Sequence, residues 1–113
     1  MSRTGGNAEG LVALASYAHT QPGTALARNV DGHTIALFNV GGLFHALDDA
    51  CLRCSASLAA ATLEGSQAIC ACGFGYDLIT GAVRGVERLR TGRYDVRVVG
   101  DDICVAIPAL VRP

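Results

Sequence analysis

The chain has 113 residues, which is enough for one domain with a modest hydrophobic core. Nine basic and ten acidic residues give a net charge of −1, so charge offers no reason to expect nucleic acid or an anionic membrane as a partner. No apolar run approaches the roughly 20 residues that a membrane-spanning helix needs. We therefore expect a cytoplasmic protein without nucleic-acid or membrane partners, with residues 1–10 as a disordered leader.

Apolar residues occur in short runs separated by turn signals that contain Gly or Pro, a pattern that predicts many short strands. In the first half of the chain the candidate strands are residues 11–16, 25–29, 34–39 and 43–47. The last three are joined by the turn signals Asp31-Gly32 and Gly41-Gly42, so they should form an antiparallel meander.

The second half begins with an irregular segment, because residues 51–63 show neither strand alternation nor a convincing helix. The short strands predicted after it are residues 67–70, 76–79, 94–99 and 103–107. The last two should form a hairpin whose apolar residues alternate with smaller or polar ones, namely Val96, Val98, Ile103, Val105 and Ile107. The predicted fold is all-β, an antiparallel β-barrel or sandwich with a small inserted loop subdomain that carries the cysteines.

Five cysteines are the most informative feature of the composition. An odd number in a chain without an evident secretion signal argues against a disulfide scaffold. Four of them form two close pairs, Cys51-x-x-Cys54 and Cys70-x-Cys72, separated by fifteen residues. Two such pairs on facing loops could place four thiolates around one centre, and soft thiolate ligands favour zinc or iron–sulfur over magnesium or calcium. The fifth, Cys104, is interpreted as a small packed residue of the last strand.

The three histidines give no independent signal for a metal site. His19 lies in a loop, His33 lies beside a turn and His45 lies in a predicted strand, so each is interpreted as a surface or half-buried side chain. A basic run in the second half is interpreted as a solvated loop face rather than a docking patch, and its members are Arg84, Arg88, Arg90 and Arg93.

Several short motifs, in their order and spacing, resemble the Rieske-type ferredoxins. They are Phe44-His45-Ala46-Leu47-Asp48-Asp49-Ala50-Cys51, Thr62-Leu63-Glu64-Gly65 before Cys70, Tyr76-Asp77-Leu78-x-Thr80-Gly81, and Tyr94-x-Val96-Arg97-Val98-x-Gly100-Asp101-Asp102. The resemblance covers about residues 11–107. It implies that residues 11–108 form one Rieske-like domain, followed by a short tail at 109–113.

The ligand motifs of this family are Cys-x-His in one loop and Cys-x-x-His in the other, so that two cysteines hold one iron and two histidines hold the second. By resemblance, Cys51 and Cys70 match the two cysteines. Arg53 occupies the first histidine position, and a guanidinium group cannot bind a metal. The second loop is one residue shorter than the family pattern, so its histidine is either absent or replaced by Cys72. A standard Rieske cluster is therefore not expected.

Cys54 and Cys72 are additions to the family pattern, and three interpretations remain open. In the first, they replace the histidines in a four-cysteine 2Fe–2S cluster, whose potential would fall toward roughly −400 mV. In the second, they complete a tetrahedral structural zinc site. In the third, no metal is bound and the loops carry thiols or a disulfide, as in the membrane-complex branch of the family. The ligands in the first two interpretations are Cys51, Cys54, Cys70 and Cys72.

The first interpretation implies an electron carrier without catalytic residues of its own. Such a Rieske-like ferredoxin would pass single electrons between a reductase and a terminal oxygenase or similar redox enzyme. The alternative is a degenerate, cluster-free Rieske-fold subunit, like the small subunits of some nitrite reductases, or a zinc-binding module that serves as a partner in assembly.

Overall fold

The predicted meander forms the centre of the structure, a computed structural model that describes residues 11–107. It consists of β3 (Ala25–Val30), β4 (His33–Val40) and β5 (Leu43–Asp48), which pair antiparallel in chain order. The short strand β11 (Arg93–Tyr94) pairs with the free side of β5 and completes a four-stranded sheet. The leader at 1–10 and the tail at 109–113 lie outside the described residues.

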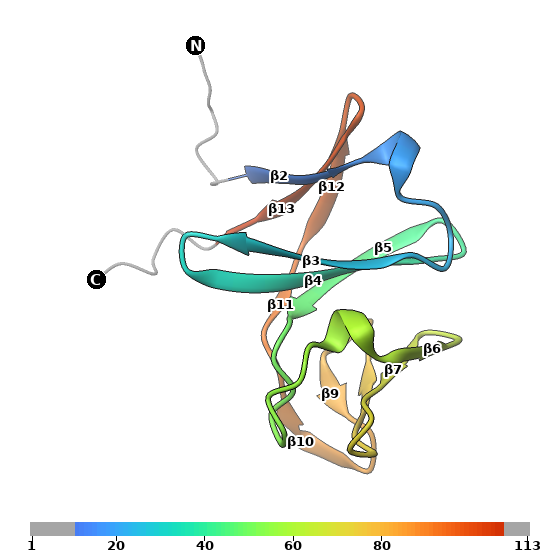
Figure 1. Ribbon diagram of the computed structural model, residues 1–113, viewed down its shortest axis with the longest axis vertical. Helices are drawn as coiled ribbons and strands as arrows, with labels where there is room; N and C mark the ends of the chain where they lie inside the picture. Colours follow the sequence, from blue (N-terminus) through green and yellow to red (C-terminus); the bar gives the residue numbers. More distant parts are fainter. Residues whose placement is uncertain (1–10, 108–113) are drawn as a thin grey trace.

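A second, three-stranded sheet lies above the meander in Figure 1. It has β13 (Asp102–Ala106) between β12 (Val96–Val99) and β2 (Leu11–Ser16), with both pairs antiparallel. The single strand predicted over 94–99 is wrong in one respect, because the chain divides at Asp95 and its two halves join different sheets. The predicted alternation also fails at Val98, whose side chain is 47% exposed.

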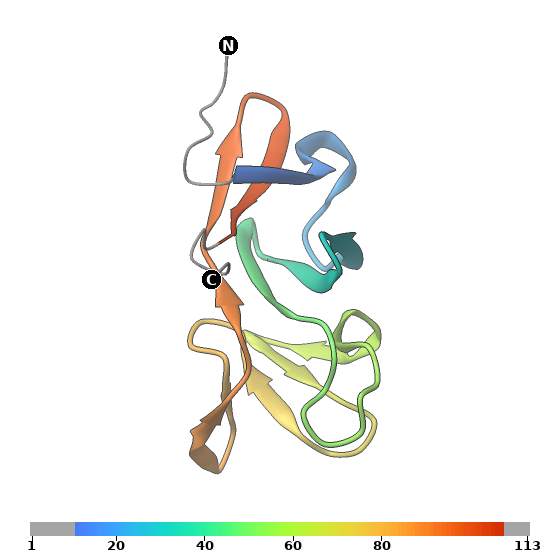
Figure 2. The ribbon, with the colours of Figure 1, turned by 90° about the vertical axis from the view of Figure 1, so that its left-hand side faces the viewer.

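The third sheet is the predicted insertion, and it occupies the lower part of the molecule in Figures 1 and 2. The chain leaves the meander after β5, builds this sheet and returns to β11. Its five strands, in sequence order and in sheet order, are β6 (Thr62–Glu64), β7 (Gln67–Ile69), β8 (Gly75–Asp77), β9 (Ala82–Val83) and β10 (Val86–Arg90).

Three strands of the insertion were not expected from the sequence. β6 and β9 are too short for period-2 alternation to be recognised, and every residue of β10 is exposed, so no buried face marks it. Arg88 and Arg90 are therefore solvated as predicted, but they lie on a strand rather than in a loop. Within the described range the helical segments are two single 3-10 turns, η1 (Tyr17–His19) and η2 (Leu58–Ala60), and neither is long or apolar enough to cross a membrane.

The molecule has two hydrophobic cores, and β4 contributes to both. Ile35 and Leu37 point into the upper core, where they pack with the buried residues Leu14, Val30, Ala46, Ile103 and Val105. Ala36 and Phe38 point from the opposite face of β4 into the lower core. The other buried members of the lower core are Leu47, Cys51, Leu58, Ala68, Cys70, Tyr76, Leu78 and Val83. Two of the four paired cysteines are thus core residues, and this fixes the cysteine loops to the sheet.

Gly81 offers a test of how tightly the turn before β9 packs against the segment that leads from β10 to β11. Its φ is +81°, and a Cβ at this position would lie 2.9 Å from the carbonyl oxygen of Thr91. Gly23 has a similar φ of +91° but open space around it. We expect Gly23→Ala to lower the free energy of unfolding by about 1–2 kcal/mol through backbone strain. Gly81→Ala should cost about 1–3 kcal/mol more, because the clash adds to the strain. Equal losses in urea unfolding of the two variants would contradict this packing.

Candidate metal centre

The first cysteine loop connects β5 to η2 and is closed by backbone hydrogen bonds. The N–H of Cys51 donates to the carbonyl of Ala56 at 2.9 Å, and the N–H of Ser55 donates to the carbonyl of Cys51 at 2.9 Å. Asp49 holds the base of the loop, since its carboxylate accepts from the Ser57 hydroxyl at 2.8 Å and from the Ala59 N–H at 3.0 Å. The loop is therefore a defined turn rather than a free connection.

The second cysteine loop joins β7 to β8 and is shorter. The N–H of Cys70 donates to the carbonyl of Phe74 at 2.8 Å, and the N–H of Gly73 donates to the carbonyl of Cys70 at 2.8 Å. Gly73 has a φ of +103°, a conformation that glycine adopts without the penalty other residues incur. The tight loop predicted from the sequence is confirmed, and it places Cys70 and Cys72 at one end of the insertion.

The two loops bring all four paired cysteines together. Their Sγ atoms lie within 4.8 Å of one another, with 3.4 Å between Cys54 and Cys70 and 3.7 Å between Cys51 and Cys72. Cys51 and Cys70 are buried, Cys72 is partly buried and Cys54 is exposed. All are free thiols, as is Cys104, which is buried on β13 as predicted. Each close pair takes one cysteine from each loop.

Tyr76 on β8 ties the first loop to the sheet, a role that the sequence did not reveal. Its hydroxyl accepts the Leu52 N–H at 2.8 Å and lies 3.3 Å from Cys51 Sγ. Burial, together with the hydrogen bond to Cys51, raises the pKa of Tyr76 well above its ordinary value. The hydroxyl therefore keeps its proton and can donate it to the sulfur. Tyr76 and Cys51 are 25 positions apart in the sequence, and a local residue pattern cannot predict that their side chains are in contact.

The two buried cysteines have opposite acidities. Burial by itself raises the pKa of Cys51, but hydrogen bonds from the Tyr76 hydroxyl and from the backbone N–H groups of Cys54 and Arg53 outweigh it and lower the pKa to about 6. At Cys70 a backbone N–H from Cys72 favours the thiolate, but burial and the neighbouring thiols outweigh it and raise the pKa to about 12. One sulfur is thus a ready thiolate, and Cys70 gives up its proton only when a cation replaces it.

Arg53 lies between the two cysteines of the first loop and does not act as a ligand. Its backbone N–H donates to Cys51 Sγ at 3.4 Å, while its guanidinium group stacks 5.5 Å from the ring centroid of Phe74. The side chain thereby links the first loop to the second.

Among residues 11–107, no histidine joins the cysteine cluster. His19 and His33 are exposed, and His45 is partly buried on β5, as the sequence predicted. Burial and the nearby Arg93 lower the pKa of His45. The four cysteines are consequently the cluster of side chains in the described residues that could hold a metal ion.

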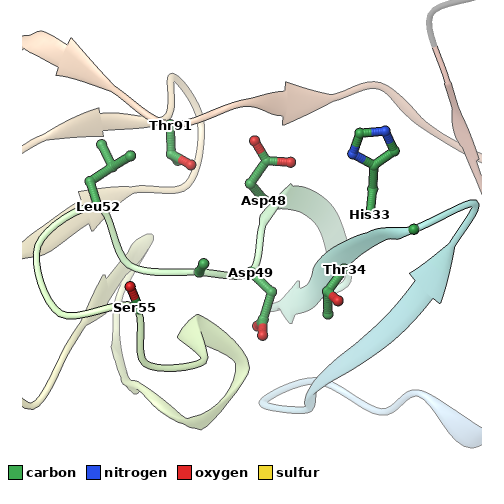
Figure 3. A pocket seen from close by; sticks show the side chains of 9 residues that line it. His33, Thr34, Asp48, Asp49, Leu52, Ser55 and Thr91 are labelled. Carbon is green, nitrogen blue, oxygen red and sulfur yellow. The ribbon is translucent and has the colours of Figure 1, made fainter. Parts of the chain in front are cut away.

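An open cleft of about 530 Å³ lies beside the first loop, and Figure 3 shows the side chains that line it. Leu52 and Ser55 border it from the loop, while Asp48 and Asp49 come from the end of β5 and the residue after it. Both carboxylates have partners, because Asp48 accepts from the Tyr94 hydroxyl and Asp49 holds the loop base. The cleft therefore exposes one side of the loop to solvent without assembling reactive groups of its own.

Two loops of an all-β domain present four converging cysteines, a donor set that could hold a metal ion such as zinc or iron. Residues 10–107 match the model of the Rieske [2Fe-2S] domain family, and the chain belongs to this family.

Solved structures agree with this assignment. The ferredoxin of carbazole 1,9a-dioxygenase from Nocardioides aromaticivorans IC177 is 28% identical with a TM-score of 0.77, over 85% of this chain and 96% of that one. A chain from the complex of reduced oxygenase and oxidised ferredoxin in carbazole 1,9a-dioxygenase is 28% identical with a TM-score of 0.78, over 85% and 92%. A protein proposed to be the small subunit of an NADH-dependent nitrite reductase from Mycobacterium tuberculosis shares the fold at 22% identity and a TM-score of 0.78, over 86% and 94%. A comparison with curated protein sequences gives no significant match.

The residues of this site do not fit the family's usual cluster. A Rieske centre needs two histidine ligands on one of its irons. Here the side chains that approach the two buried cysteines are the thiols of Cys54 and Cys72. The donor set is therefore four sulfurs, which suits iron or zinc, and a two-histidine iron site is not available among the described residues.

Tyr76→Phe tests the connection between the core and the centre. The change removes the acceptor of the partly buried Leu52 N–H and should lower the free energy of unfolding by about 0.5–1.5 kcal/mol. It also removes the hydroxyl beside Cys51 Sγ, so the visible spectrum of the metal-loaded protein should shift. Tyr94→Phe is the matched control, because it deletes a hydroxyl that binds Asp48 and should cost stability without altering the spectrum. An identical spectrum in wild type and Tyr76→Phe would show that this hydroxyl does not act on the centre.

Proposed function

We propose that this chain is a one-electron carrier of the ferredoxin class, in which the thiolates of Cys51, Cys54, Cys70 and Cys72 hold iron. The observation that carries the proposal is the convergence of four sulfur atoms within 4.8 Å in a domain of the Rieske family. When bound, iron supplies a one-electron ferric–ferrous couple. The protein contributes the ligands, their hydrogen bonds and the access of partners.

The position of the cysteines supports transfer to another protein. Both loops lie at the lower end of the molecule in Figures 1 and 2, away from the upper sheet. Cys54 is exposed and Cys72 is partly exposed, whereas Cys51 and Cys70 are buried. A centre held by these four residues would have one side in the protein core and the other at the surface. This arrangement fixes the centre rigidly and leaves a short path to a docked partner.

The kind of partner follows from the relatives. One similar chain comes from a complex of an oxygenase with its ferredoxin in carbazole 1,9a-dioxygenase. By analogy, we infer that this chain receives electrons from a reductase and passes them to a terminal oxygenase or a similar redox enzyme. The cytoplasm, which keeps thiols reduced, suits a protein with five free cysteines.

Loss of the cluster, as in a degenerate subunit, fits the site less well. Such a history explains the missing histidines but gives no reason for two additional cysteines to meet the two family cysteines at 3.4 and 3.7 Å. Structural zinc would use the same four ligands. Iron is favoured by membership of an iron–sulfur family, and metal analysis of the purified protein separates the two metals.

The ligand assignment is tested by single Cys→Ser variants of protein purified without oxygen. Cys54→Ser and Cys72→Ser should bleach or shift the visible spectrum and lower the iron content at least severalfold, because serine is a poor replacement for a soft sulfur ligand. Cys104→Ser is the matched control, because Cys104 lies on β13 in the three-stranded sheet. This variant should leave the visible spectrum and the iron content unchanged. If Cys54→Ser retains both, Cys54 is not a ligand.

Arg53 should raise the reduction potential of the centre. Reduction adds negative charge next to this guanidinium, so the cation stabilises the reduced state. We expect Arg53→Gln to shift the potential to more negative values in protein-film voltammetry. Arg97→Gln removes the same charge from β12, an exposed strand of the upper sheet, and should leave the potential unchanged. Equal shifts in the two variants would mean that overall charge, not the position of Arg53, sets the effect.

A further inference from the structure

We infer that the four cysteines enclose a single, tetrahedrally coordinated metal ion rather than a two-iron cluster. The inference rests on the proposed function for the identity of the metal as iron. The number of metal ions is independent of the proposed function, because it is inferred from the sulfur positions alone. The carrier would then be a one-iron, four-thiolate centre on a Rieske fold.

The sulfur positions match one tetrahedron. A metal ion with four thiolate ligands has metal–sulfur bonds of about 2.3 Å, so each of the six sulfur–sulfur edges measures about 3.8 Å. Two of the edges here are 3.4 and 3.7 Å, and no edge exceeds 4.8 Å.

The same positions do not match a 2Fe–2S cluster with four cysteines. In that cluster two iron tetrahedra share the edge formed by the two inorganic sulfides, and each iron binds two thiolates. With bonds of about 2.3 Å, edge-sharing tetrahedra hold the two outer thiolate pairs at least about 5.3 Å apart. The greatest separation among the four Sγ atoms is smaller than this least required distance.

The loops resist the separation that a second iron would require. Cys51 and Cys70 are 2% and 3% exposed, and backbone hydrogen bonds close the main chain around both. Cys51 Sγ is also held by the Tyr76 hydroxyl at 3.3 Å and the Arg53 N–H at 3.4 Å. Because each close pair takes one cysteine from each loop, moving the pairs apart means separating the two cysteines within both loops, and one cysteine of each loop is packed in the lower core.

The charges around the site also suit one ion. Four thiolates on a single ferric or ferrous ion leave a net negative charge, and the backbone N–H groups of Arg53 and Cys54 donate to Cys51 while that of Cys72 donates to Cys70. The guanidinium of Arg53, stacked on Phe74, adds a full positive charge beside the cluster of sulfurs. These groups offset the negative charge of the four thiolates.

The test is the composition of the full-length protein, expressed in iron-supplemented cells and purified without oxygen. Iron, zinc and acid-labile sulfide are measured per chain, and X-ray absorption at the iron edge reports the neighbours of the metal. We expect one iron and no sulfide per chain, four sulfur neighbours at about 2.3 Å and no second metal nearby. The oxidised protein should show a high-spin ferric resonance, whereas an oxidised 2Fe–2S cluster is diamagnetic.

The possible results separate this inference from the proposed function. Two irons with two sulfides per chain would overturn the single-ion site and leave the electron carrier intact. One zinc per chain without iron would support the single-ion geometry and overturn the electron carrier. A metal-free protein, with or without disulfides, would overturn both. In Cys54→Ser the X-ray absorption should lose one of four sulfur neighbours, while Cys104→Ser should retain all four.

Discussion

The strand β4 is buried on both faces, and the two halves of the molecule depend on it. Alternate residues enter opposite cores, with Ile35 and Leu37 in the upper one and Ala36 and Phe38 in the lower one. A slip of one residue in the register with β3 or β5 would exchange the two sets, so packing fixes the pairing strongly. The upper sheets and the cysteine insertion are therefore not independent modules, because one strand supplies side chains to both.

The candidate metal centre is partly embedded in the lower core and does not lie only at the surface. Cys51 and Cys70 pack within the core, and the fully buried Tyr76 contacts both the first loop and the sulfur of Cys51. The other two cysteines face outward. As ligands, Cys51 and Cys70 would be held rigidly by packing, whereas Cys54 and Cys72 would be in contact with solvent. A site for electron transfer needs both properties, since rigidity limits reorganisation and exposure shortens the distance to a partner.

The sequence predicted the elements that have local signatures. Turn residues and alternation identified the meander, and the spacing of the four cysteines predicted that they would meet. β9, with two residues, and β10, with no buried residue, lack any such signature, and the break at Asp95 depends on which sheet each half joins. The distances between the four sulfur atoms were equally out of reach. Cys-x-x-Cys and Cys-x-Cys spacings suit one ion or two, and only the closure of the loops sets the distances between sulfurs.

The changes from the family's ligand pattern are consistent with one another when they are considered together. Replacing two neutral histidines by thiolates adds negative charge to the centre, which by itself lowers the reduction potential and destabilises the assembled site. Arg53 stands where one histidine would bind, and its cation offsets part of that charge while its side chain links the loops through Phe74. In the second loop, Cys72 lies 3.7 Å from Cys51. An arginine in place of a histidine ligand would prevent metal binding at a two-histidine iron site. Beside four thiolates, its positive charge would offset part of their negative charge.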